Sequence, residues 1–319
     1  MKKVKTVTPI RAYHFMDSLW NYTSKQYKHT HKAINQPFSI SLEMSSICNL
    51  KCAECPSGQG KVKRTNAVMN IETAKKIIDR HAKSAMITQL FFQGEPFFNK
   101  HWDQILAYAS SKNLYTIINT NGHFLHTENC QKLIDNKLDR IVVSLDGATA
   151  ETYNRYRKNG QFELVTDGIK QLVKARNMRK VKYPKITMQT LLTRETENQM
   201  DEFKKLQKTL GADSVKFKTM QLYDLSNENM EYWLPQNNRH RRYQTQEKKS
   251  KKINCWRALT TAVYTSDGDL VSCCFDKTAQ HNFGHIDHNP WESEKHRTFL
   301  QHMVTGKTIP DICHNCIRK

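Results

Sequence analysis

Three cysteines within one short stretch constrain this chain more than any other feature. They are Cys48, Cys52 and Cys55, with the spacing C-x3-C-x2-C. Three thiolates on one loop can hold three corners of a [4Fe–4S] cluster. Because such clusters normally take four cysteines, one iron would stay open to an outside ligand. A structural zinc site is the alternative. Zinc takes four ligands, and no fourth Cys or His lies between residues 44 and 80, so a distant residue would have to complete it.

Length and cysteine content limit the class of protein. A chain of 319 residues can form one large α/β domain with a small appendage. No apolar run follows the basic residues 1–5, and no stretch approaches 18 apolar residues. We therefore expect neither a signal peptide nor a transmembrane helix, and no membrane partner. Nine cysteines without an export signal indicate metal ligation in a reducing, cytoplasmic compartment rather than disulfides.

The net charge of +20 is unevenly distributed. Residues 1–37 carry seven Lys or Arg against one Asp, and residues 239–252 carry seven against one Glu, so each segment contributes +6. Such runs can serve an anionic partner or form a solvated surface. Neither run has a nucleic-acid-binding motif around it, so the charge leaves a nucleic-acid partner open without favouring one.

Alternating strand and helix patterns predict the fold from residue 38 onward. Apolar or β-branched runs predict strands at 39–44, 89–93, 115–120, 140–145, 185–192 and 214–218. Amphipathic runs predict helices at 70–84, 102–112, 128–136, 163–179 and 195–210. Six β/α units in series predict a parallel sheet with helices outside it. Right-handed crossovers curl such a sheet toward a partial (β/α)6 TIM-like barrel, short of the eight units of a closed one.

The chain divides into four predicted parts. Residues 1–37 are a basic leader, which we expect to form a helix packed on the main domain. Residues 38–224 form the barrel core, and the polar residues 225–254 form a basic linker or active-site loop. Residues 255–319 form a small cysteine-rich unit with an expected hairpin around Asp267 and Gly268. The predicted fold class is therefore α/β, with a small C-terminal domain beside the partial barrel.

Candidate site residues lie at the carboxyl ends of the predicted strands, where parallel sheets collect functional groups. Gly94 and Glu95 follow the second strand, Asn121 follows the third, and Ser144 and Asp146 follow the fourth. Glycine allows the backbone to approach a ligand closely. Gly-Glu-Pro, Asn-Gly and Asp-Gly can also be simple turns, so the residues alone leave both interpretations open.

Four further cysteines lie in the last quarter of the chain. They are Cys255, Cys273, Cys313 and Cys316, the last two in a C-x2-C pair. Four thiolates are a full set for a second iron–sulfur cluster, and they are equally a full set for zinc. Cys274 adjoins one of them, and the sequence does not decide which of the two neighbours is the ligand.

Together these motifs resemble the radical S-adenosylmethionine (SAM) superfamily. The C-x3-C-x2-C spacing is its signature, and Gln93-Gly94-Glu95-Pro96 is similar to its GGEP motif, with Gln in place of the first Gly. The resemblance implies that the open iron chelates the amino and carboxylate groups of SAM. An electron, supplied by a flavodoxin or ferredoxin, then splits SAM into methionine and a 5′-deoxyadenosyl radical, which abstracts hydrogen from a substrate.

The resemblance also assigns SAM-binding roles to seven positions. They are Gly94, Glu95, Asn121, Ser144, Asp146, Arg157 and Leu192. Glu95 and nearby backbone groups would receive the SAM ammonium group. Ser144 and Asp146 fall in the region that binds ribose or carboxylate, since hydroxyl and carboxylate groups suit sugar hydroxyls. Arg157 falls near SAM or substrate and Leu192 near adenine, although a surface arginine and a core leucine are equally ordinary.

The C-terminal unit resembles the SPASM/twitch extensions of this superfamily. The resemblance implies one auxiliary [4Fe–4S] cluster on the four C-terminal cysteines. Relatives that oxidise a substrate often place an acid beside a ligand, where this chain has Cys274. Cys274 or Asp276 is therefore a candidate for proton or hydrogen transfer. The chain departs from the family at Glu54, where an apolar residue usually covers adenine.

The substrate divides the functional hypotheses. The compact C-terminal unit and the basic loop favour a small, anionic substrate such as a sugar, nucleotide or lipid precursor. The alternative is a maturase that modifies a peptide or protein, against which stands the lack of room for a peptide-recognition domain in residues 1–37. A zinc-binding structural protein and an RNA-modifying enzyme are weaker alternatives, the latter resting only on positive charge.

Overall fold

The strands of the protein form a single sheet in the computed structural model, which describes residues 6–24, 36–242, 255–314 and 316. The order across this sheet is β6-β5-β4-β3-β2-β1-β7-β8-β9. Strands β1 to β6 pair in parallel, as do β1 and β7, while β7, β8 and β9 pair antiparallel. The strands are β1 Ser39–Leu42, β2 Ile87–Gln89, β3 Tyr115–Thr120, β4 Arg140–Ser144, β5 Lys185–Leu192, β6 Ser214–Thr219, β7 Thr261–Tyr264, β8 Asp269–Val271 and β9 Asn282–His285.

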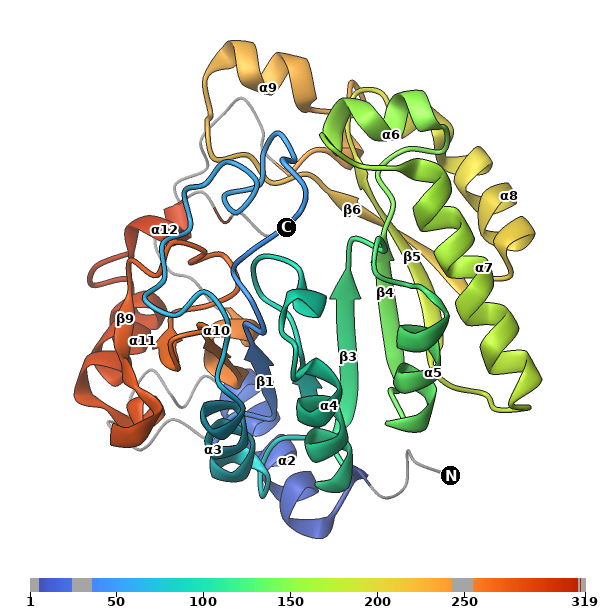
Figure 1. Ribbon diagram of the computed structural model, residues 1–319. Helices are drawn as coiled ribbons and strands as arrows, with labels where there is room; N and C mark the ends of the chain where they lie inside the picture. Colours follow the sequence, from blue (N-terminus) through green and yellow to red (C-terminus); the bar gives the residue numbers. More distant parts are fainter. Residues whose placement is uncertain (1–5, 25–35, 243–254, 315, 317–319) are drawn as a thin grey trace.

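Helices cover the outer face of the parallel strands, as Figure 1 shows for α4, α5, α7 and α8. The α-helices are α2 Pro9–Ser24, α3 Ile71–His81, α4 Trp102–Ser111, α5 Thr127–Asp135, α6 Ala150–Tyr156, α7 Phe162–Met178, α8 Met200–Leu210, α9 Asn227–Trp233, α10 Trp256–Thr260, α11 Glu294–Thr305 and α12 Asp311–His314. The 3-10 helices are η2 Pro96–Phe98, η3 Glu197–Gln199, η4 Asn238–His240, η5 Ile286–His288 and η6 Pro290–Glu292. The predicted α/β fold with a partial (β/α)6 barrel is confirmed. Within the described residues, no helix has both the length and the apolar character that crossing a membrane requires.

Local sequence explains where the elements begin. Asn70 caps α3 by accepting a hydrogen bond from the Glu72 backbone N–H at 2.8 Å, as predicted. The unpredicted α6 starts with a reciprocal capping box between Thr149 and Thr152. Helix α8 starts five residues later than predicted, because residues 197–199 form the 3-10 turn η3 instead.

The barrel strands alternate between an apolar outer face and a polar inner face. In β1, Ile40 and Leu42 belong to the core packed under the helices, so Ser39 and Ser41 face the concave side. In β6, the Phe217 ring lies 6.1 Å from the Phe203 ring of α8, which puts the neighbouring Lys218 on the concave face. The concave side is therefore lined largely by polar and charged side chains.

The C-terminal hairpin extends the barrel sheet. The predicted turn at Asp267 and Gly268 joins β7 to β8, so the hairpin is confirmed. The sequence did not predict that β7 pairs in parallel with β1, in the register Ser39 with Thr261. The cysteine-rich unit is thus continuous with the barrel rather than a separate body on a linker.

Helix α2, from the predicted leader, is fixed to the barrel by Arg11. This side chain is 4 % exposed and donates to the carbonyl oxygens of Ala82, Lys112 and Asn113 at 2.7 to 3.0 Å. Ala82 and Lys112 are the C-caps of α3 and α4, whose last carbonyls otherwise lack partners. The rest of the leader, residues 1–5 and 25–35, lies outside the described residues, as do residues 243–254 of the predicted linker.

Arg11→Met should destabilise the protein by about 3 kcal/mol, because it removes a buried guanidinium that donates four hydrogen bonds to carbonyls at the ends of α3 and α4. Urea-induced unfolding under argon measures the loss. The control is Arg179→Met, which removes an exposed arginine paired with Asp135 at 3.2 Å and should cost less than about 1 kcal/mol. Equal losses in the two variants would contradict the anchoring role of Arg11.

Candidate functional site

The first three cysteines lie on the loop after β1, at the carboxyl end of the parallel strands, which we call the barrel mouth. Their thiols interact electrostatically with one another. Burial raises the pKa of Cys48, and it raises the pKa of Cys52 to about 12. A buried thiolate is costly unless a positive group neutralises it. The loop therefore fits a metal group that binds all three thiols.

Hydrogen-bond donors surround Cys48. The Leu50 backbone N–H lies 3.4 Å from the Cys48 Sγ, and Asn121 Nδ2 lies 3.7 Å from it. Such N–H groups tune the iron–sulfur clusters that cysteines hold. Asn121 also donates to Asn49 Oδ1 at 2.8 Å, so the predicted residue at the end of β3 holds the cysteine loop directly.

Gly94 and Glu95 are fixed against the cysteine loop. Gly94 has φ +61°, and a Cβ there would lie 2.4 Å from the Ser45 carbonyl oxygen, so only glycine fits. The fully buried Glu95 carboxylate accepts from the Asn121 N–H and the Thr120 hydroxyl, both at 2.7 Å. Burial raises the pKa of Glu95 to about 7, although these donors oppose the shift. Glu95 thus joins the ends of β2 and β3 beneath the loop.

The structure brings five of the seven predicted SAM-binding residues together with the three cysteines. The five residues and the three cysteines line one cavity of about 120 Å³. The five are Gly94, Glu95, Asn121, Ser144 and Arg157. Ser144 donates to Asn119 Oδ1 at 3.1 Å, and both side chains line the cavity. Ser57 also lines it and accepts from the Gly94 N–H at 3.1 Å. Sequence reasoning missed Ser57, for which nearness to the third cysteine was the only signal.

Asp146 and Leu192 lie outside that cavity. Asp146 is 2 % exposed, pairs with Arg157 through Oδ2 at 2.5 Å and accepts from the Leu191 N–H at 2.7 Å. It borders a second cavity of about 390 Å³, lined also by Tyr156 and Trp233. Leu192 is buried, but the apolar cluster beside the cysteine loop contains Leu191 in its place. Successive side chains of a strand point to opposite faces, which explains the difference.

Glu54, the departure from the family pattern, points toward the segment after β6. It is 9 % exposed and accepts from the Asn229 side chain at 3.3 Å and the Tyr223 N–H at 3.4 Å. The residue therefore ties the cysteine loop to the start of α9.

The second set of cysteines also gathers in one place. Cys273 interacts electrostatically with Cys255 and Cys313, and Cys313 with Cys316. Burial raises the pKa of Cys273 well above its usual value and raises the pKa of Cys313 to about 12. The Cys316 N–H donates to the Cys313 carbonyl at 3.2 Å, the same turn that Cys55 and Cys52 make in the first loop. By number, four thiols are a full set for an iron–sulfur cluster or for zinc. Within the described residues, no three His, Cys, Asp or Glu side chains form a group that could hold a single metal ion.

The two predicted catalytic candidates lie in different surroundings. Cys274 accepts a hydrogen bond from Arg257 Nη1 at 3.3 Å and is partly exposed, whereas its neighbour Cys273 faces the other cysteines. Asp276 is 1 % exposed, and its carboxylate accepts from Ser272 Oγ and from the backbone N–H groups of residues 280 and 281. The structure thus uses Asp276 to organise its own loop and does not place it at the mouth.

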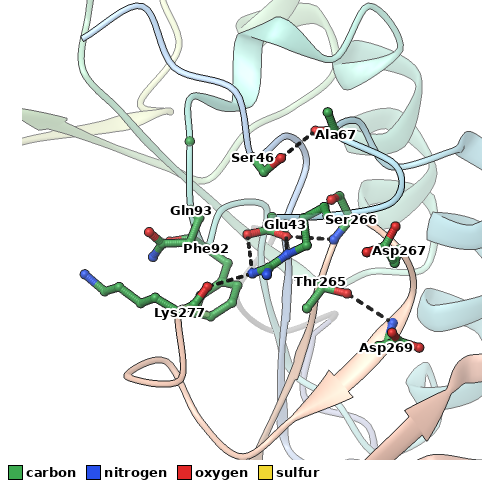
Figure 2. A network of polar contacts seen from close by, with 12 residues as sticks. Glu43, Ser46, Ala67, Phe92, Gln93, Thr265, Ser266, Asp267, Asp269 and Lys277 are labelled. Carbon is green, nitrogen blue, oxygen red and sulfur yellow. Dashed lines mark hydrogen bonds and ion pairs between the residues drawn. The ribbon is translucent and has the colours of Figure 1, made fainter. Parts of the chain in front are cut away.

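A buried ion pair joins the two cysteine regions (Figure 2). Arg64, at the far end of the first loop, donates to both oxygens of Glu43 at 2.7 and 3.2 Å, and to the Lys277 carbonyl at 2.8 Å. Glu43 also accepts from the Ser266 N–H, in the turn between β7 and β8, at 2.8 Å. Both side chains are nearly inaccessible to solvent. Sequence reasoning missed this pair, for which a glutamate inside an apolar strand was the available signal.

Two family models match the chain. One, described as the Radical SAM superfamily, matches residues 42–207, and the other, described as the SPASM iron-sulfur cluster-binding domain, matches residues 255–317.

Curated relatives and solved structures agree with these matches. The mycofactocin maturase MftC of Mycobacterium tuberculosis (strain CDC 1551 / Oshkosh) is 26 % identical over 57 % of this chain and 44 % of its own length. The AdoMet-dependent heme synthase of Methanosarcina barkeri is 30 % identical over 56 % of this chain and 49 % of its own. The chain thus spans about half the length of these relatives. The crystal structure of Streptococcus suis SuiB bound to precursor peptide SuiA has a TM-score of 0.62 at 15 % identity, over 91 % of this chain and 72 % of that one, which is a likeness of fold.

Arg64→Met should destabilise the protein by about 4 kcal/mol, because it leaves the Glu43 carboxylate buried without its partner. Urea-induced unfolding under argon again measures the loss. The double variant Glu43→Gln with Arg64→Met should lose less than the single variant, because it no longer buries an unpaired charge.

The matched control is Arg155→Met, which breaks an arginine–glutamate pair at 2.8 Å on the exposed surface of α6. It should cost less than about 1 kcal/mol. A loss for Arg64→Met no larger than this control would contradict the joining role of the buried pair.

Proposed function

The chain belongs to the radical SAM superfamily, and from that premise we propose that it cleaves SAM reductively and uses the resulting radical to modify a peptide. The observation that carries the proposal is the gathering of three free thiols, of which Cys52 is buried, and five polar or backbone groups around one cavity at the barrel mouth. In this proposal residues 38–224 carry out the cleavage, and residues 255–319 hold an auxiliary [4Fe–4S] cluster.

The chain's own residues bind and orient the reactants. When bound, the cluster would supply one electron, received from a donor such as flavodoxin or ferredoxin, and SAM would accept it and supply a radical able to abstract hydrogen. Cys48, Cys52 and Cys55 would hold the cluster. Glu95 fixes Asn121 beside the open side of the loop, and Arg157 places a positive charge next to Cys52.

Two cavities suit the two ends of SAM. The cavity of about 120 Å³ is smaller than an ordinary ligand pocket, so we assign only the amino-acid end of SAM to it. Arg157 lines the cavity of about 120 Å³, and its ion-pair partner Asp146 lines the cavity of about 390 Å³. We therefore assign the nucleoside end of SAM to the region around this ion pair, between the two cavities.

A peptide substrate is supported by the relatives and by the shape of the barrel. The relatives include a maturase, and the SuiB structure of similar fold holds a precursor peptide. The polar concave face of a barrel that has only six β/α units is compatible with an extended polar chain. A small molecule is the second candidate substrate, because the heme synthase is related at a similar level.

Cysteine substitutions separate the two proposed clusters. Cys→Ala at 48, 52 or 55 should abolish 5′-deoxyadenosine formation from SAM with dithionite, because the cluster at the mouth is lost. Cys→Ala at 255, 273, 313 or 316 should spare SAM cleavage and lower the iron content from roughly eight to roughly four per chain. Anaerobic reconstitution, iron analysis and chromatography of the nucleoside measure both effects.

Cys130→Ala is the control for this series. Cys130 is buried on α5, where its S–H donates to the Leu125 carbonyl at 3.4 Å, and the variant should keep both iron content and SAM cleavage. Zinc in place of iron in the reconstituted wild type, or equal loss of SAM cleavage in both cysteine sets, would contradict the proposal.

A further inference from the structure

We propose that Lys218, Arg242, Arg257 and Lys277 form a cationic cluster beside the barrel mouth, here called the recess, and that this cluster binds a carboxylate group of the substrate. The inference rests on the proposed function only in naming the substrate, because the recess itself can be tested by binding alone.

The four cationic side chains come from four separate elements. Lys218 is on the concave face near the end of β6, Arg242 follows η4, Arg257 is in α10, and Lys277 follows the loop of Cys273. The four residues are far apart in the sequence, and only the folded structure brings them together.

Cys274 lies at the centre of the group. Arg257 Nη1 lies 3.3 Å from its Sγ, and Lys218 and Lys277 both interact with it electrostatically. Lys277 also interacts with Cys55 of the first cysteine loop and with Arg242, and Lys218 interacts with Arg257. Figure 2 shows the Lys277 side chain extending away from the buried Glu43–Arg64 pair. The recess therefore lies between the two cysteine sets, so a substrate bound there would be close to both.

These cations differ from three interior arginines that have carboxylate partners. Arg64, Arg157 and Arg176 each pair with a carboxylate. Among the described residues, no carboxylate forms an ion pair with any of the four recess cations. Lys218 does interact electrostatically with the Asp146 carboxylate, but the two oxygens of that carboxylate already accept hydrogen bonds from Arg157 and from the Leu191 N–H.

Their arrangement is unfavourable without an anion. Burial and the positive charge of Arg257 lower the pKa of Lys218. Arg242 Nε is buried without a hydrogen-bond partner. Like charges held together repel, and a bound anion would relieve the repulsion. These side chains keep contact with solvent, so the recess is open to a ligand.

The chemistry of the recess favours a carboxylate. Arginine binds carboxylates through two parallel N–H···O bonds, and lysine adds a point charge. Aromatic rings hold two of the cations in place, because the Arg242 guanidinium lies 4.7 Å from the Phe275 ring centroid and the Lys277 ammonium 5.2 Å from that of Tyr223. In the proposed peptide substrate, the carboxylate is an acidic side chain or the C-terminus.

Binding of a rhodamine-labelled hexaglutamate peptide to the reconstituted protein tests the recess. Fluorescence anisotropy under argon, at about 0.15 M salt where the Debye length is about 8 Å, measures Kd. Lys218→Gln and Lys277→Gln should each weaken binding about tenfold, as expected when one charged hydrogen bond is lost. A labelled hexaglutamine peptide should bind at least about tenfold more weakly than hexaglutamate.

The charge-matched control is Lys170→Gln, which removes an exposed lysine paired with Asp167 on α7 and should change Kd less than about twofold. Lys218→Gln is the decisive variant if Lys277→Gln disturbs the cysteine loops, since Lys218 is far from every cysteine in sequence. Unchanged Kd in Lys218→Gln, or an equal loss in Lys170→Gln, would overturn the recess and leave the cations as counter-charges for the clusters.

Two further measurements distinguish a peptide substrate from a small carboxylate substrate, and the recess from the proposed SAM chemistry. Direct binding of the small tricarboxylate tricarballylate, measured by isothermal titration calorimetry and weakened about tenfold in Lys218→Gln, with no binding of hexaglutamate, would support the recess and replace the peptide with a small carboxylate substrate. SAM cleavage by the same wild-type preparation tests the proposed function separately, because a protein that binds hexaglutamate but forms no 5′-deoxyadenosine would keep the recess and lose the proposed chemistry.

Discussion

Strand β1 is hydrogen-bonded in parallel along both edges, to β2 on one side and to β7 on the other. Every other feature of the site depends on this position. The strand ends at Leu42, and the next residue, Glu43, begins the buried contacts that fix the cysteine loop to the C-terminal hairpin. One short strand of alternating serine and apolar residues therefore sets the first three thiols relative to both halves of the chain. Its outward side chains, Ile40 and Leu42, secure it in the core under the helices.

Local patterns were sufficient for the barrel but not for what joins its parts. Side-chain alternation and amphipathic periodicity predicted six strands and five helices, because each signal lies within a few residues of the element it specifies. The ends of parallel strands meet at one edge, and this rule correctly grouped Gly94, Asn121 and Ser144 with the cysteines. The β1–β7 pairing and the Glu43–Arg64 pair connect distant residues and have no local signature. The role proposed for Asp276 stays a prediction, although its carboxylate accepts hydrogen bonds from the backbone of its own loop, for which the sequence carries no signal.

Several of the positively charged residues that matter for the site lie outside the segments that stand out in the sequence. By sequence, the charge concentrates in residues 1–37 and 239–252, which suggests solvated segments. In the structure, interior arginines such as Arg11 and Arg64 are fully engaged by carbonyl or carboxylate oxygens. Lys218 and Lys277, which belong to neither basic run, are instead brought toward Cys274. Like charges held close together repel, which is the physical reason for the ligand site that we propose there.

A six-stranded barrel cannot fill its own interior as a closed eight-stranded barrel does. Its concave face is polar, so the mouth depends on loops for cover. The cysteine loop covers the mouth and is held by three hydrogen bonds. Glu54 accepts one from Asn229 of α9, and Asn49 accepts one from Asn121. Arg64 donates the third to the Lys277 carbonyl, in the segment that follows the hairpin. The Arg64 contact links the first cysteine loop directly to the segment between β8 and β9 that carries Cys274 and Lys277.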